Sequence, residues 1–399
     1  MIENGKFCVI GVGGAGCRII SHLVQDKTAE KLKLIAIDTD KNGLAESQLP
    51  PEQCILAGEI WRNGRGTGGS IIDGQRAFSH ERARIEDKIK DCRMVIVCGG
   101  LGGGTASGGI PIILSCSSNM RVPAVTMVTV PFAVEGGLRQ RISEQAINNE
   151  IIKIADAVIT VPNDLLFSSL DPATPLAEAF KLSDEEMARS VLAISTILCA
   201  GNLLNADFAD FSNLLWRKKS TCALGIGVVD TAAEQEPFTA EKAFSRLLES
   251  PLLGGASKLC DADAVIFTLT GGNDLSLADA QSVFAISTSH IGKKTAVLVG
   301  AATEPEWQGK FQYTALAVKY EQETIPSSSA GERKKSKRNQ RLEQENNDMI
   351  QQILPLSEND FNRGIMEKTT PVRWNGEELD VPTFRRRNQI IDTGKDPLS

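Results

Sequence analysis

The sequence predicts an α/β protein: a doubly wound parallel-sheet domain, a central long helix and a second α/β domain, then a disordered C-terminal linker and peptide. Three observations carry this prediction. Short apolar, β-branched runs alternate with helical stretches at the start, a long helical periodicity follows, and the composition turns polar near the end. The chain has 399 residues, 42% of them apolar. More than one core is expected, because single cores stop growing at roughly 250 to 300 residues.

The first domain, expected over residues 1–175, contains five runs that are apolar throughout. Parallel strands covered by helices on both faces have this character, whereas half-exposed strands alternate. The expected strands are KFCVIGV at 6–12, LKLIAID at 32–38, RMVIVCG at 93–99, AVTMVTVPF at 124–132 and DAVITVP at 156–162.

A central helix with the loop after it is expected over residues 176–220, because apolar residues recur at helical spacing and Gly201 can end the helix. The second domain, residues 221–320, contains two helical stretches and four strand-like runs. The strands are CALGIGVV, AVIFTLTG, TAVLVGAAT and FQYTALAV, and the helices AEKAFSRLLES and LADAQSVFAISTSH.

Residues 321–370 contain few aromatic and β-branched residues and predict a disordered linker, because such a segment cannot bury enough surface to offset its ordering. Residues 371–399 regain apolar and basic residues, as in VRWNGEELDVPTFRRRNQII. A short segment of this kind after a tether is typical of a peptide that binds a partner.

Charge and composition exclude several classes of protein. The net charge is −7 and the pI about 5.3, so no general nucleic-acid binding is expected. The start lacks the layout of a signal peptide and no apolar run is long enough to span a bilayer, so we expect a soluble protein that stays in the cytoplasm. Nine scattered cysteines without a C-x-x-C pair, and three isolated histidines, predict neither a disulfide framework nor a metal site.

The first glycine cluster, GVGGAG, follows the first strand and precedes a helix. Gly11, Gly13 and Gly16 occupy the three positions of G-x-G-x-x-G, and Asp38 ends the next strand. This is the fingerprint of dinucleotide binding, in which backbone N–H groups at a helix N-terminus approach a pyrophosphate. An NAD-dependent oxidoreductase is therefore one candidate function, beside other kinds of nucleotide binding.

A second cluster, GGLGGGTASGG at 99–109, again follows an apolar strand, and a third, RNGRGTGGS, lies at 62–70. Two nests of amides at one crevice suit a triphosphate better than a dinucleotide. The sequence has no G-x-x-x-x-G-K-[ST], so a P-loop lysine is absent. We expect amides, Mg²⁺ and Arg139 to neutralise the phosphates.

Six motifs in this order resemble the tubulin/FtsZ superfamily, and most closely its bacterial FtsZ branch. They are GVGGAG, IDTD, GGLGGGTASGG, PFAVEGGLRQR, VPNDLL and NADFADF, and the resemblance covers roughly residues 6 to 320. It implies a GTPase that binds GTP or GDP with Mg²⁺ and polymerises head to tail. It also implies that the loop after the central helix completes the site of the next subunit.

The resemblance assigns roles residue by residue. Asp207 and Asp210 would be the catalytic carboxylates that position water, and Asn205 would help hold their loop. Glu135 and Arg139 would contact ribose and phosphate, Asn163 the sugar or base, and Phe180 would stack beneath the base. The implied contacts in the glycine loops are Gly13, Gly14, Ala15, Cys17, Arg18, Gly68, Gly69, Gly100, Gly102, Gly103, Gly104, Thr105, Ala106 and Ser107.

Glu185 falls where the family has an acid that accepts the guanine N–H donors, although SDEE leaves the register open between Asp184 and Glu185. Three positions depart from the family. Ala106 replaces an inner glycine, Arg18 replaces an asparagine near the base, and the third loop lacks its usual proline. If position 106 needs a positive φ, alanine adds about 1 kcal/mol of strain or more.

The end of the chain resembles the peptide through which FtsZ binds membrane adaptors of the FtsA or ZipA type. Leu379, Val381, Pro382 and Phe384 would supply its apolar face, with Asp380 and Arg385 beside them. The resemblance implies filaments that form the cytokinetic ring at the division site, on the inner face of the membrane. A filament-forming paralogue with a structural role and weak GTPase activity is the first alternative, and the oxidoreductase is the second.

Overall fold

A computed structural model of the chain describes residues 7–321 except 168–169, 172, 200–212, 216–218 and 305–306, together with 373–374 and 377–378. Contacts divide the chain into one unit, Met1–Glu323, and another, Thr324–Ser399. In the second unit, β11 (Arg373–Trp374) pairs antiparallel with β12 (Glu377–Glu378). The residues expected to bind an adaptor, from Leu379 to Arg385, lie outside the described residues.

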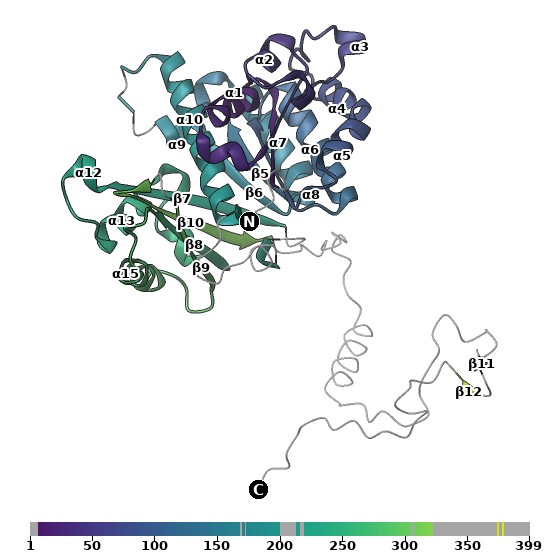
Figure 1. Cartoon of the computed structure of the whole chain (residues 1–399). Helices are drawn as coiled ribbons and strands as arrows, with labels where there is room; N and C mark the ends of the chain where they lie inside the picture. Colours follow the sequence, from purple (N-terminus) through teal and green to yellow (C-terminus); the bar gives the residue numbers. More distant parts are fainter. Residues whose placement is uncertain are drawn as a thin grey trace, which may run out of the picture. The chain divides into compact units, whose positions relative to one another are not determined.

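The first unit is built on one ten-stranded sheet with the order β3-β2-β1-β4-β5-β6-β7-β10-β8-β9 (Figure 1). Neighbours from β3 to β7 are parallel, β10 is antiparallel to β7 and β8, and β8 is parallel to β9. All nine expected strands are present, and β3 is an addition. The bounds are β1 Phe7–Val12, β2 Lys33–Asp38, β3 Cys54–Leu56, β4 Met94–Gly100, β5 Ala124–Val130, β6 Ala157–Pro162, β7 Ser220–Asp230, β8 Ala264–Gly271, β9 Ala296–Thr303 and β10 Lys310–Tyr320.

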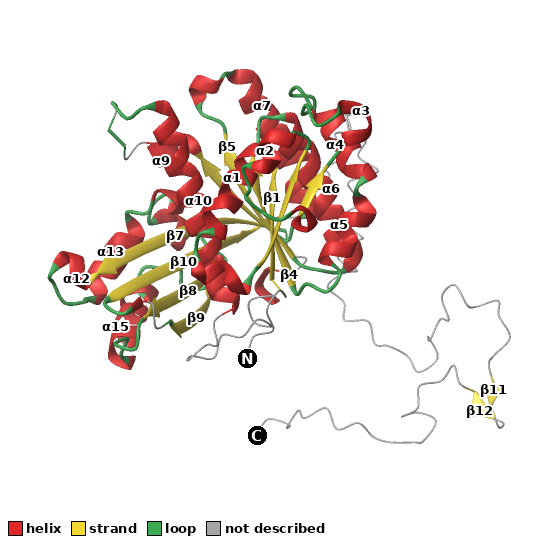
Figure 2. Cartoon of the chain, turned by 45° about the horizontal axis from the view of Figure 1, so that its top comes forward, coloured by secondary structure: helices red, strands yellow, loops and turns green. Residues whose placement is uncertain are grey.

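Helices cover both faces of the parallel half, which confirms the doubly wound prediction (Figure 2). Alternate strand residues enter different cores: Val9 packs with α1 and α10, whereas Ile10 packs with α4, α5 and α6. The longer helices here are α1 Gly13–Val24, α4 Ile71–His80, α5 Arg82–Ile89, α6 Gly104–Met120, α7 Gly137–Ala146 and α10 Leu176–Cys199. The short ones are α2 Lys41–Ala45, α3 Glu59–Arg62, α8 Ile152–Ile154 and α9 Asn163–Phe167.

The central helix, α10, has the expected length and one apolar face. Met187, Val191 and Ile194 are fully buried in the core that α1 also covers. The same core continues through Leu224 of β7 and Leu316 of β10. Helix α10 therefore packs against both halves of the unit.

The second half places β7, β10, β8 and β9 around a separate core that contains Phe267 and Tyr313. Both expected helices are present, α13 (Ala240–Leu248) and α15 (Leu277–Thr288), with the short α12 (Thr231–Glu234) and α14 (Ser257–Cys260). Serine and threonine caps fix the starts of α13 and α15, as expected for side chains that accept from free helix N–H groups. Only residues 157–159 of β6 pair with β7, and this short ladder joins the two halves.

The strand order reverses direction at β1, which lies between β2 and β4. In open parallel sheets, ligands bind in the crevice at such a switch point, outside the carboxyl ends of the strands. Here β1 leads into α1 at Gly13, and β4 leads through residues 101–103 into α6 at Gly104. The fold thus places both N-termini at the same edge of the sheet.

Close backbone contacts hold these two helix starts. A Cβ on Gly16 would lie 2.7 Å from the carbonyl carbon of Gly11 and 2.9 Å from the carbonyl oxygen of Cys98. A Cβ on Gly104 would lie 2.4 Å from the carbonyl oxygen of Ser70. No real Cβ tolerates such distances to backbone, so glycine is required for packing at both positions.

Gly16→Ala is expected to lower the free energy of unfolding by about 1–3 kcal/mol, because the added methyl must push backbone atoms apart. The control is Gly137→Ala, since a Cβ there meets no atom within 4 Å. Urea unfolding of both variants against the parent chain measures the difference. Equal effects at the two positions would contradict the packing explanation.

Candidate functional site

A cavity of about 500 Å³ lies at the switch point, where the carboxyl ends of the strands face α1, α7 and α10. It brings together eight of the residues singled out from the sequence, from segments spread over about 170 positions. These are Ala15, Arg18, Gly100, Gly103, Glu135, Arg139, Asn163 and Phe180. Five further residues complete the wall: Leu101, Thr129, Pro131, Ser183 and Asp184.

The two glycine loops form one side of the cavity and touch each other. A Cβ on Gly100 would lie 3.0 Å from Cβ of Ala15, and one on Gly13 would lie 3.6 Å from Cβ of Thr105. Gly13 and Gly102 have φ values of 71° and 92°, in the left-handed region that favours glycine. Unpaired N–H groups at the starts of α1 and α6 make this side suited to an anion.

Side chains hold the second loop from beneath. The backbone N–H of Gly102 donates to Oγ of Ser107 at 3.1 Å, within the first turn of α6. The hydroxyls of Thr39 and Thr105 lie 2.7 Å apart, which links the end of β2 to the start of α6. Thr105 and Ser107 therefore support the loop instead of lining the cavity.

The third glycine loop packs on the same helix start. A Cβ on Gly104 would lie 2.5 Å from Oγ1 of Thr67, so the two loops are in contact. Gly68 and Gly69 follow with positive φ values of 60° and 86°, and a Cβ on either would meet nothing within 4 Å. Neither residue lines the cavity.

Ala106 does not need the positive φ that would have strained it. It lies inside α6 and is not among the described residues with φ in the left-handed region. Its side chain is buried, and a Cβ on Gly99 would be 3.5 Å from it. The condition for strain at this position is therefore not met, because the residue is helical.

An ion pair forms another part of the wall. Arg139 Nη1 donates to Glu135 Oε2 at 2.9 Å, and Glu135 Oε1 accepts from the backbone N–H of Phe132 at 3.0 Å. The side chain of Arg139 is 59% exposed. Arg139 is thus a cation held at the cavity mouth, near the glycine loops.

Phe180 and Asn163 lie at the side of the cavity formed by α10 and the start of α9. The ring of Phe180 meets that of Phe132 edge to face, with centroids 5.4 Å apart. Ser183 donates to Oδ1 of the buried Asn163 at 3.3 Å. An aromatic ring beside an amide suits a flat heterocycle.

Asp184, and not Glu185, is the acid of α10 that lines this cavity. Arg18 Nε donates to Asp184 Oδ2 at 2.6 Å, and Arg18 Nη1 lies 3.6 Å from Glu46 Oε2. Burial raises the pKa of Asp184 above its ordinary value, and the hydrogen bond from Arg18 opposes that shift. The sequence contains one signal that favours Asp184 over Glu185. Asp184 follows Phe180 by four residues, so the two side chains lie on the same face of the helix.

The remaining predicted residues fall in three places. Gly13, Gly14, Gly102 and Gly104 belong to the loops without lining the cavity, and Cys17 is buried in the core. Burial raises the pKa of the Cys17 thiol far above its ordinary range. Asn205, Asp207 and Asp210 lie outside the described residues.

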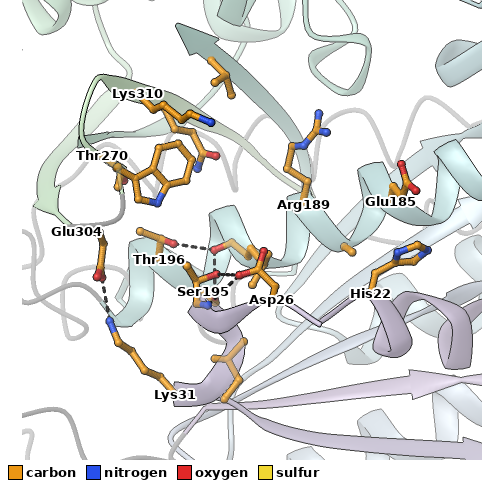
Figure 3. Close-up of a pocket in the computed structure, with 17 residues that line it drawn as sticks. His22, Asp26, Lys31, Glu185, Arg189, Ser195, Thr196, Thr270, Glu304 and Lys310 are labelled. Atoms are coloured by element: carbon orange, nitrogen blue, oxygen red, sulfur yellow. Dashed lines mark hydrogen bonds and ion pairs between the residues drawn. The ribbon is translucent and has the colours of Figure 1, made fainter. Parts of the chain in front are cut away.

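A second cavity, of about 570 Å³, lies between α10, the turn after α1 and the second half of the sheet (Figure 3). Glu185 and Arg189 face it from α10, and Trp307 from the segment before β10. Lys31 Nζ pairs with Glu304 Oε1 at 2.9 Å across it. Neither glycine loop reaches this cavity, so the phosphate-binding features belong to the first.

The described part of the chain contains no group of three or more His, Cys, Asp or Glu side chains that could hold a metal ion by themselves. Mg²⁺ in nucleotide sites is commonly held by substrate phosphates with one or two carboxylates, and Glu135 and Asp184 are the carboxylates that line this cavity. Within the same residues, none of the helices combines the length and apolar character that crossing a bilayer requires.

Asp38, the acid of the dinucleotide fingerprint, is engaged elsewhere. It is 3% exposed, and its Oδ1 accepts from the backbone N–H of Thr39 at 2.6 Å and of Asp40 at 3.2 Å. It does not line the cavity. Burial raises its pKa to about 6, against the lowering effect of these hydrogen bonds.

Asp38→Asn is expected to stabilise the protein increasingly as the pH rises. A carboxyl whose pKa is raised on folding favours the folded state below its unfolded pKa and loses that benefit as the pH passes about 6. The difference in free energy of unfolding between variant and parent should increase by up to about 3 kcal/mol from pH 4 to pH 7. Urea unfolding across this range tests it, with the exposed Asp261→Asn as control. A gap that does not change with pH would contradict it.

Two family descriptions match the chain. "Tubulin/FtsZ family, GTPase domain" covers residues 6–171, and "FtsZ family, C-terminal domain" covers residues 222–320. The first includes every described segment that lines the cavity except α10. The chain matches a GTPase domain, and Asp38 does not line the cavity. Both findings argue against the alternative that the protein is an NAD-dependent oxidoreductase.

Solved structures agree with these matches. An empty FtsZ dimer from M. jannaschii has a TM-score of 0.71 at 28% identity, over 79% of this chain and 88% of that one. A GTPγS-bound protofilament of CetZ2 from Haloferax volcanii has 0.64 at 21%, over 86% and 98%. CetZ1 from the same organism, a GDP-bound monomer, has 0.65 at 18%, over 78% and 93%, so both CetZ structures support the fold alone.

The crevice built from two glycine loops, and the two family matches on either side of α10, lead to one conclusion. The chain belongs to the tubulin/FtsZ family and carries its GTPase domain followed by an FtsZ C-terminal domain.

Proposed function

We propose that the protein is an FtsZ-type GTPase that polymerises head to tail and hydrolyses GTP at the interface between subunits. One observation carries the proposal. Both carboxylates that line the described cavity are already paired with arginines, Glu135 with Arg139 and Asp184 with Arg18. The described cavity therefore offers no unpaired carboxylate to position an attacking water.

The phosphates of GTP would bind at the helix starts of α1 and α6. Backbone N–H groups there need no counter-charge of their own, and the helix dipoles favour the anion. Arg139 stands at the mouth and would meet an outer phosphate or the ribose together with Glu135. Mg²⁺ would supply further neutralisation of the phosphate charge when it is bound with the nucleotide.

The base would lie against Phe180 and Asn163. Asp184 can accept the adjacent N1–H and N2–H donors of guanine, because only one of its carboxylate oxygens receives a bond from Arg18 among the described contacts. Adenine offers no such pair of donors. The cavity thus supports guanine over adenine.

The acids that would activate water come from the far end of α10. Phe180 and Cys199 are 19 residues apart in that helix, so Cys199 lies about 28 Å further along its axis. Leu214 is fixed at that same far end, because its carbonyl oxygen accepts from the hydroxyl of Tyr320, which pairs with Ser220. Asp207 and Asp210 belong to the segment that joins these two points.

Because the described residues on either side of this segment, Cys199 and Leu214, lie at the end of the sheet opposite the cavity, the segment would suit the cavity of another subunit. Head-to-tail stacking would bring the segment from 200 to 212 of one subunit over the phosphates of its neighbour. Phosphoryl transfer depends on positioning and electrostatics, so carboxylates that arrive on assembly would make hydrolysis depend on the filament. The M. jannaschii FtsZ dimer supports association between subunits.

Two complementary variants test the shared site. Asp210→Ala should bind GTP normally but lose hydrolysis by about 100-fold or more, as for loss of a positioning base. Gly103→Asp should lose GTP binding, because it adds a negative charge where a side chain meets no other atom within 4 Å. Mixed in equal amounts, they should regain about a quarter of the parent activity, since one interface in four pairs an intact cavity with an intact loop.

Phosphate release measured on the mixture, with light scattering alongside, gives the answer. Asp87→Ala serves as the control for loss of a surface acid. If the mixture shows only the sum of the two separate activities, the site lies within one subunit and the proposal of a shared site is wrong.

We also propose that the chain acts in the cytokinetic ring through its C-terminal peptide. The support is the sequence ELDVPTFRRR, together with higher identity and TM-score to the FtsZ structure than to the CetZ structures. An adaptor of the FtsA or ZipA type would bind Leu379, Val381, Pro382 and Phe384 and hold filaments at the inner membrane face.

Deleting residues 376–390 should abolish binding to such an adaptor while GTP hydrolysis and filament formation stay within about twofold of the full chain, because the FtsZ C-terminal domain ends at 320. Sedimentation of filaments with and without adaptor measures both effects. Loss of filaments in the deleted chain would contradict this role for the peptide.

The paralogue with a structural role remains a second candidate, because Arg18 occupies one oxygen of the acid expected to bind the base. Such a protein would bind GTP, form filaments and turn over slowly. The same phosphate-release assay separates the two: activity that appears only above a threshold concentration and follows the scattering supports the FtsZ-type function.

A further inference from the structure

We infer that Cys8 and Cys92 form a reversible oxidation site, in which a hydroperoxide converts the two thiols into a disulfide between β1 and the segment that joins α5 to β4. Both thiols are free in the structure and are buried in one core cluster. The sequence predicts no disulfide framework, and this pair is a redox site instead of a permanent link. Neither cysteine lines the cavity with the glycine loops, so the site is independent of the proposed function.

Strand register places Cys8 beside a lysine on one face of the sheet. Cys8 of β1 pairs with Lys33 of β2 and with Val95 of β4, so the three side chains point to the same face. Helix α5 covers that face, because its Ile85 is buried in the same cluster as Cys8. Cys92, between α5 and β4, belongs to this cluster as well. The fold therefore brings both cysteines to the edge of the sheet where β1, β2 and β4 begin.

One backbone carbonyl connects the second thiol to the lysine. Sγ of Cys92 donates to the carbonyl oxygen of Lys88, near the end of α5, at 3.8 Å. Nζ of Lys33 donates to the same oxygen at 2.6 Å. A hydrogen bond between the thiols of Cys8 and Cys92 completes the cluster. Two thiols and one ammonium group thus belong to a single hydrogen-bonded group.

The hydrogen bond between the thiols makes them unequal. It lowers the pKa of Cys92, an effect that burial opposes, Lys33 supports and the charge of Asp91 opposes. The same bond, together with burial, raises the pKa of Cys8 well above its ordinary value. The thiolate is the form of cysteine that attacks an oxidant. Cys92 is therefore the attacking residue and Cys8 the resolving residue.

The position of Cys92 allows a small oxidant to reach it. Its side chain is 9% exposed, against 1% for Cys8, and it lies between the exposed residues Asp91 and Arg93. A molecule as small as hydrogen peroxide can approach its sulfur from this edge. Cys8 meets the oxidant only through Cys92, which gives the reaction its order.

The oxidation then has two balanced steps. The Cys92 thiolate attacks one oxygen of hydrogen peroxide, the O–O bond breaks, hydroxide leaves and Cys92 becomes a sulfenic acid. The sulfur of Cys8 attacks the sulfenic sulfur, the S–S bond forms, and the hydroxyl group leaves as water with the proton of the Cys8 thiol. The hydroxide of the first step takes up the proton that Cys92 had released. Two thiols are oxidised by two electrons, and the peroxide is reduced to water.

Peptide mapping of the folded full chain tests the pair. After treatment with stoichiometric hydrogen peroxide at neutral pH and alkylation of the remaining thiols, mass spectrometry should show Cys8 joined to Cys92 as the main disulfide. In Cys8→Ala, dimedone should trap a sulfenic acid on Cys92, whereas in Cys92→Ala the thiol of Cys8 should stay reduced. The control is Cys260→Ala, which removes an exposed cysteine outside the cluster and should leave the disulfide unchanged.

The lysine has its own test. Lys33→Met should slow formation of the disulfide at neutral pH by about threefold or more, because a smaller fraction of Cys92 is thiolate, and Lys33→Arg should restore the rate. The slowing should disappear at a pH high enough to ionise Cys92 fully. Lys88→Met is the matched control, since Nζ of Lys88 donates to the carbonyl oxygen of Glu52 at 2.7 Å and should not affect the rate.

Three results on the parent chain would overturn the proposal: a main disulfide with another partner, oxidation of Cys260 while Cys8 and Cys92 stay reduced, or the same disulfides in folded and urea-unfolded chains. In the last case the pairing would not depend on the fold. These measurements decide the question even where the cysteine variants do not fold. A parent-like rate in Lys33→Met at neutral pH would show that Lys33 does not activate Cys92.

Discussion

The close approach of glycine backbones at the start of α1 and α6 is the constraint on which the rest of the site depends. A methyl group on Gly16 or Gly104 would collide with backbone atoms, so these helices could not begin as close to β1, β4 and the third loop. Because the helices begin there, their free N–H groups face one crevice. The crevice can therefore bind an anion through backbone N–H groups, without a lysine of the P-loop type.

The charged side chains around this crevice are paired with one another. Glu135 holds Arg139 at the mouth, and Asp184 holds Arg18 beside the first glycine loop. Each arginine keeps donors that its carboxylate does not use. The pairs therefore orient cations without neutralising every donor, which is what recognition of a phosphate or a base edge requires.

The length of α10 separates binding from chemistry in the proposed function. Its first turns carry Phe180 and Asp184 to the cavity, and its last residues lie at the opposite end of the sheet. The apolar face that packs this helix against both halves also fixes that separation. The described residues on either side of the segment that contains Asp207 and Asp210 lie away from the cavity, which is why hydrolysis is proposed to require a neighbouring subunit.

Local patterns in the sequence were sufficient for nine of the ten strands of the large sheet, for α10 and for the glycine loops, because each depends on residues close together in the chain. They were not sufficient for three features of the site. The pairing of Arg18 with Asp184 spans 166 positions. The choice of Asp184 over Glu185 depends on about 100° of helix rotation, which one residue of register changes. The helical φ of Ala106 depends on where α6 begins.

The sequence also did not predict that both halves share one sheet, because this continuity depends on a few residue pairs between β6 and β7. The sequence pattern of each strand is the same whether its neighbour lies in its own domain or in the next. The sequence therefore predicted most of the segments that form the site, but not the contacts between them.

A crystal structure of the full chain with GDP and Mg²⁺ tests the central claim most directly. The account predicts phosphates at the backbone N–H groups that start α1 and α6, and the guanine edge against Asp184 beside Phe180. A nucleotide bound in the second cavity, between His22 and Trp307, would contradict it. So would phosphates at the crevice with the base directed away from Asp184.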